Sequence, residues 1–254
     1  MRLDQYVSEN KKISRSKAQD LIKQELVLVN NKVITKNALE LKAEDIVEIK
    51  DEVLSFASRG AFKLFYAIQD FKIDLKDKIC LDVGASTGGF SDVCLYHQAK
   101  KVYAVDAGVD QLIERLKNDS RIINLEQVNA RYLTKDQFDD PIDFICMDVS
   151  FISIKKILPT LFQLVDNFEA VILIKPQFEC GKQYIGKKGI VKDLKVHKMV
   201  LKDIMTFVLE QGYYIANLAP SKMEGRDGNQ EYLIHITSIK NDKFFDLNQI
   251  VKKR

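Results

Sequence analysis

Leu81-Asp82-Val83-Gly84-Ala85-Ser86-Thr87-Gly88-Gly89-Phe90 has the pattern of a buried strand, a glycine turn and the first turn of a helix. The preceding Ile79-Cys80-Leu81 is apolar, and the three glycines allow positive φ angles and close approach of the backbone to a ligand. A turn of this kind is where a doubly wound α/β sheet holds its cofactor. The stretch therefore predicts a strand, a ligand-binding turn and a helix; a tight turn without a ligand is the alternative.

The glycine spacing and the acid before the turn discriminate between ligands. The pattern is G-x-x-x-G-G and not the G-x-G-x-x-G of dinucleotide sites, where a pyrophosphate lies on the helix N-terminus. Asp82 would repel a pyrophosphate but would tolerate a cation. S-adenosylmethionine carries a sulfonium and an ammonium and no phosphate, so the pattern favours it as the cofactor. The predicted cofactor-binding residues of the turn are Asp82, Gly84, Ala85, Ser86, Gly88, Gly89 and Phe90.

Composition and charge leave several classes of protein open and exclude others. The chain has 254 residues, 46% of them hydrophobic, which suits one α/β domain with a small additional unit. Its net charge of +3 permits a nucleic-acid partner without requiring one. The four cysteines have no C-x-x-C spacing and predict buried free thiols in a reducing compartment. The absence of a long apolar run and of an apolar N-terminal signal predicts a cytoplasmic protein without membrane contact.

Residues 1–50 predict a small α+β domain, with two helical patterns followed by short strands at 27–29, 33–34 and 46–49. Ser14 is placed to cap the second helix. Basic residues surround the start of that helix, where they oppose its dipole. RNA phosphates would explain them, and a solvated basic surface is the alternative. The RNA-binding candidates from this cluster are Lys11, Lys12, Arg15 and Lys17.

Beyond a linker at 51–57, a second domain over 58–240 shows alternating strands and helices, and 241–254 forms a basic tail. Apolar runs that end in a charged residue are typical of buried parallel strands. The order predicts a doubly wound, Rossmann-like sheet with a hairpin-like pair of strands at one edge. The predicted strands are 79–83, 102–106, 122–125, 142–148, 170–175, 213–219 and 231–239, and the predicted helices are 61–71, 89–98, 109–117, 153–166 and 193–211.

Polar residues end several of these strands, and ligands gather at the carboxyl ends of strands in such a sheet. Asp106 follows Gly84 by 22 positions, near the spacing at which an acid reaches a cofactor ribose. Asn129 is a candidate for the adenine edge. Asp148 and Lys175 end two further strands and complete the predicted edge. For any single one of these residues, a solvated strand end is the alternative.

Lys175 is unusual because it ends a strongly apolar run and precedes Pro176, which favours extended backbone at the lysine and is expected to stop a helix from starting there. A free lysine has a pKa of about 10.4 and is no base at neutral pH. Desolvation and a second cation, Lys63, would lower that pKa. Asp148 and Glu231, which we expect to orient both amines, would raise it. Which effect wins stays open, and Glu231 could instead be a surface acid at the start of a strand.

Two resemblances follow from these motifs. Residues 1–50 resemble the alpha-L RNA-binding domain found in a small-subunit ribosomal protein and in pseudouridine synthases, through Arg2-Leu3-Asp4, Ser14-Arg15-Ser16-Lys17-Ala18 and Val27-Leu28-Val29-Asn30. Residues 58–240 resemble the FtsJ-like ribose methyltransferase domain, and the whole chain resembles the TlyA family, also called hemolysin A. The motifs are Ser58-Arg59-Gly60 before Lys63, the turn from Leu81, Asp148-Val149-Ser150-Phe151-Ile152-Ser153, Lys175-Pro176-Gln177-Phe178-Glu179 and Gly228-Asn229-Gln230-Glu231.

The resemblance implies a catalytic set of Lys63, Asp148, Lys175 and Glu231, with S-adenosylmethionine as donor and the 2′-hydroxyl of a ribosomal RNA cytidine as acceptor. The expected partner is ribosomal RNA or a ribosomal subunit, and no protein partner is implied. The motifs that carry the two resemblances also contain Arg2 and Arg59, which we add to the RNA-binding candidates. No metal site is predicted, because His97, His197 and His235 lack ligand spacing.

Three other functions remain as alternatives. The hemolysin name suggests a membrane-active protein, but the chain has no long amphipathic helix with a basic face. An RNA-binding ribosome assembly factor without catalysis is the second. The third is methyl transfer to a base nitrogen, which normally needs a pocket for a flipped base. Two lysines beside acids suit a hydroxyl acceptor better.

Overall fold

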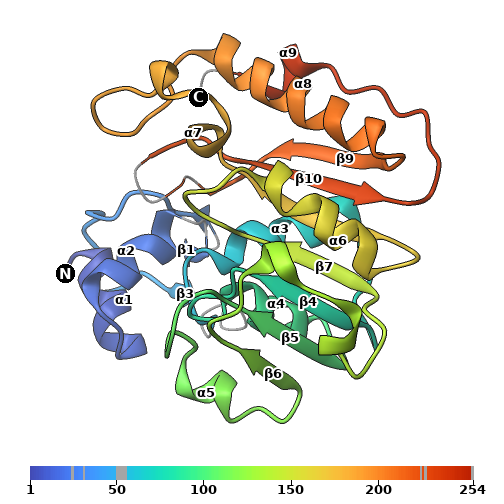
Figure 1. Cartoon of the computed structure of the whole chain (residues 1–254). Helices are drawn as coiled ribbons and strands as arrows, with labels where there is room; N and C mark the ends of the chain where they lie inside the picture. Colours follow the sequence, from blue (N-terminus) through green and yellow to red (C-terminus); the bar gives the residue numbers. More distant parts are fainter. Residues whose placement is uncertain (24–25, 31, 50–55, 224, 226–227, 253–254) are drawn as a thin grey trace. The chain divides into compact units, whose positions relative to one another are not determined.

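The computed structural model describes residues 1–23, 26–30, 32–49, 56–223, 225 and 228–252 (Figure 1). The chain divides into two compact units, Met1–Arg59 and Gly60–Arg254. The predicted linker at 51–57 falls mostly on residues 51–55, which lie outside the described residues. Each unit has its own sheet, so each is considered by itself.

The smaller unit has the two helices and the short strands that its sequence predicts. The Ser14 hydroxyl accepts a hydrogen bond from the Lys17 amide at 3.3 Å, which confirms the predicted cap of the second helix. Strand β1 pairs antiparallel with both β2 and β3. The elements are α1 (Leu3–Lys11), α2 (Arg15–Lys23), β1 (Val27–Val29), β2 (Lys32–Val33) and β3 (Val47–Ile49).

The larger unit is built on a seven-stranded sheet with the order β6-β5-β4-β7-β8-β10-β9. The first five in this order run parallel, and β10 pairs antiparallel with both β8 and β9. This confirms the doubly wound sheet and the antiparallel pair at its edge. The strands are β4 (Ile79–Val83), β5 (Lys101–Val105), β6 (Ile122–Leu125), β7 (Phe144–Met147), β8 (Glu169–Ile174), β9 (Tyr214–Pro220) and β10 (Tyr232–Thr237).

Helices cover both faces of this sheet (Figure 1). α3 and α4 pack against each other on one face, and α4 contacts β4 and β5. On the other face, apolar residues of α6 and α8 share one core with alternate residues of the strands, because side chains alternate along a strand. All four cysteines are buried free thiols, as the sequence predicts. The helices are α3 (Ala61–Phe71), α4 (Gly89–Tyr96), α5 (Glu114–Lys117), α6 (Leu158–Leu164), α7 (Pro176–Glu179), α8 (Leu194–Glu210) and α9 (Leu247–Ile250).

The structure differs from the sequence predictions at four places. The helix predicted over 109–117 is reduced to α5, and the one over 153–166 is split into a 3-10 turn at Ile154–Lys156 and α6. The expectation that Pro176 stops a helix is wrong: Pro176 is the first residue of α7, a position where proline is favoured because its missing N–H would be unpaired anyway. The predicted C-terminal tail carries α9 and buries Val251 against the core of the larger unit.

Candidate active site at the carboxyl edge of the sheet

Two lysines and two acids from four separate elements meet beside the sheet. The Lys63 ammonium in α3 lies 2.6 Å from Glu231 Oε2 and 3.9 Å from Asp148 Oδ2. The Lys175 ammonium lies 2.5 Å from Asp148 Oδ1. Asp148 therefore lies between the two cations, and the four charges alternate in sign.

The sheet topology brings these residues together. Asp148 and Lys175 directly follow β7 and β8, which are parallel neighbours, so both stand at the same edge. Glu231 directly precedes β10, and because β10 runs antiparallel to β8, its beginning lies at that edge too. Lys63 comes from the first turn of α3, a helix that contacts β10.

Three of these side chains are almost fully buried. Lys63 and Lys175 are each 8% exposed and Glu231 is 2% exposed. Burial raises the pKa of Glu231, and the neighbouring Lys63 opposes that rise. Buried charges are tolerated when they are paired, so each member of the cluster depends on the others.

Ser150 also belongs to the cluster, although the sequence did not single it out. Its hydroxyl accepts a hydrogen bond from the Lys175 ammonium at 2.9 Å. Glu231 is expected to orient both amines; among the described residues it forms an ion pair with Lys63 and none with Lys175. The position of Ser150, two residues after Asp148, is the signal that could have identified it.

A cavity of about 500 Å³ opens next to Asp148 at the same edge. Gly84 shapes its floor, because its φ is +82° and a Cβ there would come within 2.6 Å of the Asp148 carbonyl oxygen. The cavity therefore depends on glycine at this position. The lining residues are Val83, Gly84, Ser86, Val105, Asp106, Ala107, Gln111, Val128, Asn129, Ala130, Arg131, Asp148, Val149, Ser150, Phe151, Ile152 and Ile157.

Four predicted cofactor residues line this cavity: Gly84 and Ser86 in the turn after β4, and Asp106 and Asn129 in the segments that follow β5 and β6. The Asp106 carboxylate accepts hydrogen bonds from the Ser86 amide at 2.8 Å and the Gly108 amide at 2.7 Å. The Asn129 side-chain oxygen accepts one from the Arg131 amide at 3.1 Å. Both side chains are thus held at the cavity wall by the surrounding backbone.

Asp82 lies below the turn, not in the cavity. It is 0% exposed, and its carboxylate accepts hydrogen bonds from the amide and the hydroxyl of Ser91, at 2.8 and 2.7 Å. Burial raises the pKa of Asp82 to about 7. The described cavity lining likewise omits Ala85, Gly88, Gly89 and Phe90, so the cofactor role of these five residues stays a prediction.

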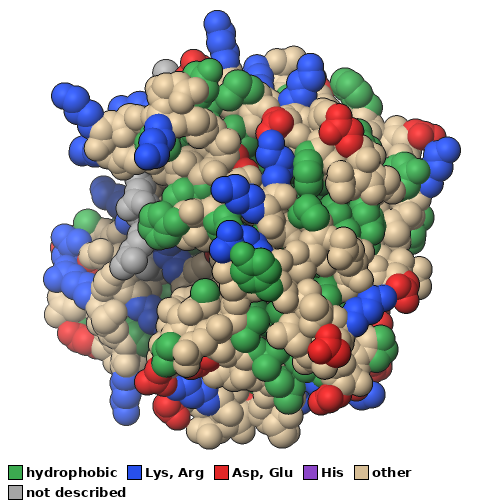
Figure 2. Space-filling model, viewed as in Figure 1, with side chains coloured by type: hydrophobic (Ala, Val, Ile, Leu, Met, Phe, Trp, Pro, Cys, Tyr) green, Lys and Arg blue, Asp and Glu red, His purple; other side chains and the backbone are tan. Residues whose placement is uncertain are grey.

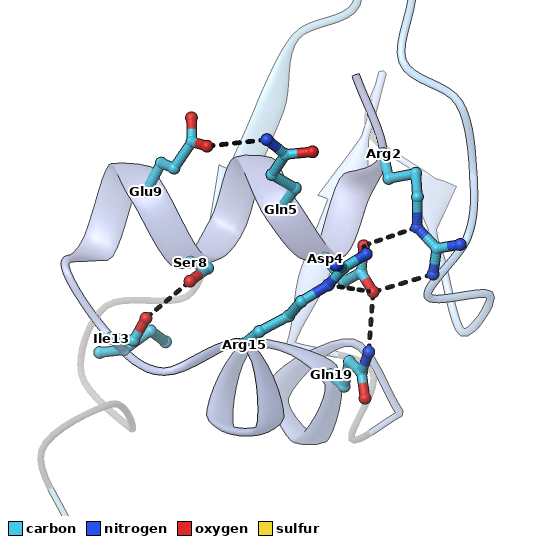
Figure 3. A network of polar contacts seen from close by, with 8 residues as sticks. All are labelled: Arg2, Asp4, Gln5, Ser8, Glu9, Ile13, Arg15 and Gln19. Carbon is cyan, nitrogen blue, oxygen red and sulfur yellow. Dashed lines mark hydrogen bonds and ion pairs between the residues drawn. The ribbon is translucent and has the colours of Figure 1, made fainter.

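Arg2 and Arg15, two of the RNA-binding candidates, share a local partner in the smaller unit (Figure 3). The Arg2 and Arg15 guanidiniums lie 3.0 and 3.1 Å from Asp4 Oδ2. Gln19 donates a further hydrogen bond to this carboxylate at 2.8 Å. The hydrogen bonds from Arg2 and Arg15 hold the pKa of the buried Asp4 well below its usual range. Arg15 at the start of α2 is therefore explained in part by this acid, and its side chain is still 53% exposed.

The other RNA-binding candidates lie at the surface of the same unit. Lys12, Lys17 and Arg59 are exposed, and Lys11 is half-buried. On the face shown in Figure 2, Lys and Arg side chains are spread among Asp and Glu side chains. RNA binding by these residues stays a prediction. Among the described residues, no helix is long and apolar enough to cross a membrane.

Comparisons with known proteins match both units. Residues 56–238 match the FtsJ-like methyltransferase family, and residues 1–47 match the S4 domain. The chain is 44% identical over 238 residues to Hemolysin A of Brachyspira hyodysenteriae, covering 92% of this chain and 99% of that protein. It is 37% identical over 256 residues to the 23S rRNA (cytidine-2′-O)-methyltransferase TlyA of Campylobacter jejuni, covering 92% and 98%. A solved structure from Streptococcus thermophilus, named as a hemolysin, superposes with a TM-score of 0.75 at 36% identity and covers 99% of this chain and 94% of its own.

Proposed function

Because the chain belongs to the FtsJ-like methyltransferase family and carries an S4 domain, we propose that it methylates the ribose 2′-oxygen of a cytidine in ribosomal RNA. The observation that carries this proposal is the buried cluster of Lys63, Asp148, Lys175 and Glu231 beside the cavity. The relative in Campylobacter jejuni carries this activity in its name. Such a substrate would bring the protein to the ribosomes of the cytoplasm.

The residues around the cavity fit S-adenosylmethionine, which supplies a methyl group activated by its sulfonium. The cavity volume of about 500 Å³ lies in the range typical of small-molecule sites. The Asp106 carboxylate is a suitable acceptor for ribose hydroxyls, and Asn129 offers an amide to a base edge. Asp148 lines the cavity and also pairs with Lys175, so it joins the donor site to the lysines.

The cluster has groups that can accept the proton of the acceptor hydroxyl and stabilise the negative charge that develops on its oxygen. Methyl transfer to a ribose oxygen requires that the hydroxyl lose its proton as the new bond forms. In the proposed mechanism, Lys175 takes that proton in its neutral amine form, and the Lys63 ammonium stabilises the developing negative charge on oxygen. Asp148 orients both amines, and Glu231 balances Lys63.

The hemolysin name of one relative leaves a membrane-active protein as the rival, and an assembly factor without catalysis is a second. Burying two lysines paired with acids costs desolvation energy. Neither a membrane-active protein nor an assembly factor without catalysis needs such a cluster. Methyl transfer to a ribose hydroxyl needs the paired lysines and acids, so it accounts for the buried cluster.

The test is to incubate the purified protein and labelled S-adenosylmethionine with each separated ribosomal subunit. We expect label in RNA at an alkali-resistant linkage, since a 2′-O-methyl group removes the hydroxyl that alkaline cleavage needs. The Lys175→Ala variant should lose this activity and still bind the cofactor. Label in an alkali-cleavable position, or full activity of the variant, would refute the proposal.

A further inference from the structure

Lys175 has an ion-pair partner and a hydrogen-bond acceptor that come from one loop. Asp148 Oδ1 lies 2.5 Å from its nitrogen, and Ser150 Oγ accepts a hydrogen bond from it at 2.9 Å. Both residues follow β7 and are separated only by Val149. The Phe178 ring centroid lies 5.9 Å from the same nitrogen.

A hydrogen bond fixes the direction of an amine that an ion pair alone would leave free to turn. An ammonium carries three N–H bonds in tetrahedral positions, and a neutral amine carries two N–H bonds and a lone pair. Asp148 attracts the Lys175 nitrogen by charge, and the hydrogen bond to Ser150 takes one of the positions and so sets the rotation about the Cε–Nζ bond. The third position, which faces neither Asp148 nor Ser150, is then fixed; without Ser150 the amine would be free to rotate.

We propose that Ser150 is a positioning residue that fixes the third position of the Lys175 nitrogen toward the acceptor hydroxyl. This inference rests on the proposed function. In that reaction the O–H bond of the ribose would break and its proton would go to the lone pair of a neutral Lys175. The oxygen electrons would form the bond to the methyl carbon as the carbon–sulfur bond of the donor breaks and leaves its electron pair on sulfur. A serine suits the task because its hydroxyl accepts a hydrogen bond without adding a third negative charge to the cluster.

The loop that carries Ser150 is fastened to the segment that follows Lys175. The Glu179 carboxylate in α7 accepts hydrogen bonds from the Ser153 hydroxyl at 2.6 Å and from the Ile154 amide at 2.9 Å. Donor and acceptor are therefore held on two segments that are tied together close by. Such support is what accurate positioning requires, because small displacements at a reacting group are costly.

The test compares Ser150→Ala with the conservative Ser150→Thr, and uses Ser120→Ala as a control at another exposed serine. Ser150 is exposed, so its replacement leaves the core intact. With the ribosomal subunit that accepts label, we expect kcat of Ser150→Ala to fall about 10- to 100-fold, as a misplaced reacting group does. KM for cofactor and subunit should stay within about twofold. Ser150→Thr should recover most of kcat, and Ser120→Ala should match the parent protein.

A second readout needs no substrate. In protein labelled with ¹⁵N-lysine, the side-chain nitrogen signal of Lys175 reports how firmly the amine is held. We expect this signal to show greater motion in Ser150→Ala and parent-like motion in Ser150→Thr. An unchanged signal in Ser150→Ala, an unchanged kcat, or no recovery with threonine would overturn the proposal. If no subunit accepts label, the proposed function fails while the nitrogen signal still decides whether Ser150 holds the lysine.

Discussion

Among single residues, Asp82 links folding to pH. Burial raises its pKa to about 7, from an ordinary value near 3.8, despite two hydrogen bonds from Ser91. The folded protein thus binds this proton more tightly than the unfolded chain, so the stabilisation is full below about pH 4 and is lost as pH rises toward 7. We expect the unfolding free energy of the parent protein, relative to Asp82→Asn, to drop by about 2–3 kcal/mol between pH 5 and pH 8. Denaturant titration at pH 5 and pH 8 measures this difference in unfolding free energy. The same pH dependence in the parent protein and in Asp82→Asn would contradict the raised pKa of Asp82.

Lys63 and Glu231 form a pair whose coupling free energy can be measured separately. Their charged atoms lie 2.6 Å apart and both side chains are buried, so removing one partner leaves an uncompensated charge. We expect Lys63→Met and Glu231→Gln each to destabilise the protein by about 3 kcal/mol. The double variant should be more stable than the sum of the two losses predicts, while methylation stays lost in all three. Thermal and denaturant unfolding measure the coupling, and strictly additive losses would show that the pair is not coupled.

At the level of elements, the turn between β4 and α4 depends on its first glycine. Alanine at Gly84 would bring a Cβ within 2.6 Å of a backbone oxygen at φ +82°. Gly212 has φ +83° with nothing within 4 Å of its Cβ position, so it is a matched control for backbone strain alone. We expect Gly84→Ala to weaken S-adenosylmethionine binding at least about 10-fold, because the cavity floor must shift. Calorimetric titration should show unchanged affinity in Gly212→Ala, and equal affinity in both variants would mean that the turn does not shape the site.

The elements also explain how far the sequence could predict this site. Asp106, Asp148 and Lys175 were expected at one edge, since parallel strands bring their carboxyl ends together whatever the loops do. Which amine pairs with which acid depends on how a helix lies against the sheet, and no local pattern encodes that. For this reason Glu231, which was expected to hold both amines, pairs among the described residues with Lys63 only, and Ser150 was missed. Pro176 was misjudged because proline blocks a helix interior but favours a helix start.

For the protein as a whole, the two units predict a division between binding the RNA and performing the chemistry. Arg2 and Arg15 are poor probes of RNA binding because both hold the buried Asp4, and their replacement would disturb the fold of the smaller unit. Lys12 and Lys17 are exposed on the same unit, so they can be neutralised with less effect on folding. Lys100 and Lys240 provide a control with the same change in charge, because they lie at the edge of the large sheet opposite the cavity.

We expect Lys12→Gln/Lys17→Gln to bind the ribosomal subunit more weakly while its affinity for S-adenosylmethionine stays unchanged. Each lost phosphate contact removes about 0.7–0.9 from the slope of log K against log salt concentration, so the double variant should lose about 1.5. Filter binding over a range of salt concentrations measures that slope. Lys100→Gln/Lys240→Gln should keep the slope of the parent protein. If that control loses as much, charge in general attracts the RNA and the smaller unit has no special part in recognition; a slope loss confined to Lys12→Gln/Lys17→Gln assigns RNA contacts to it.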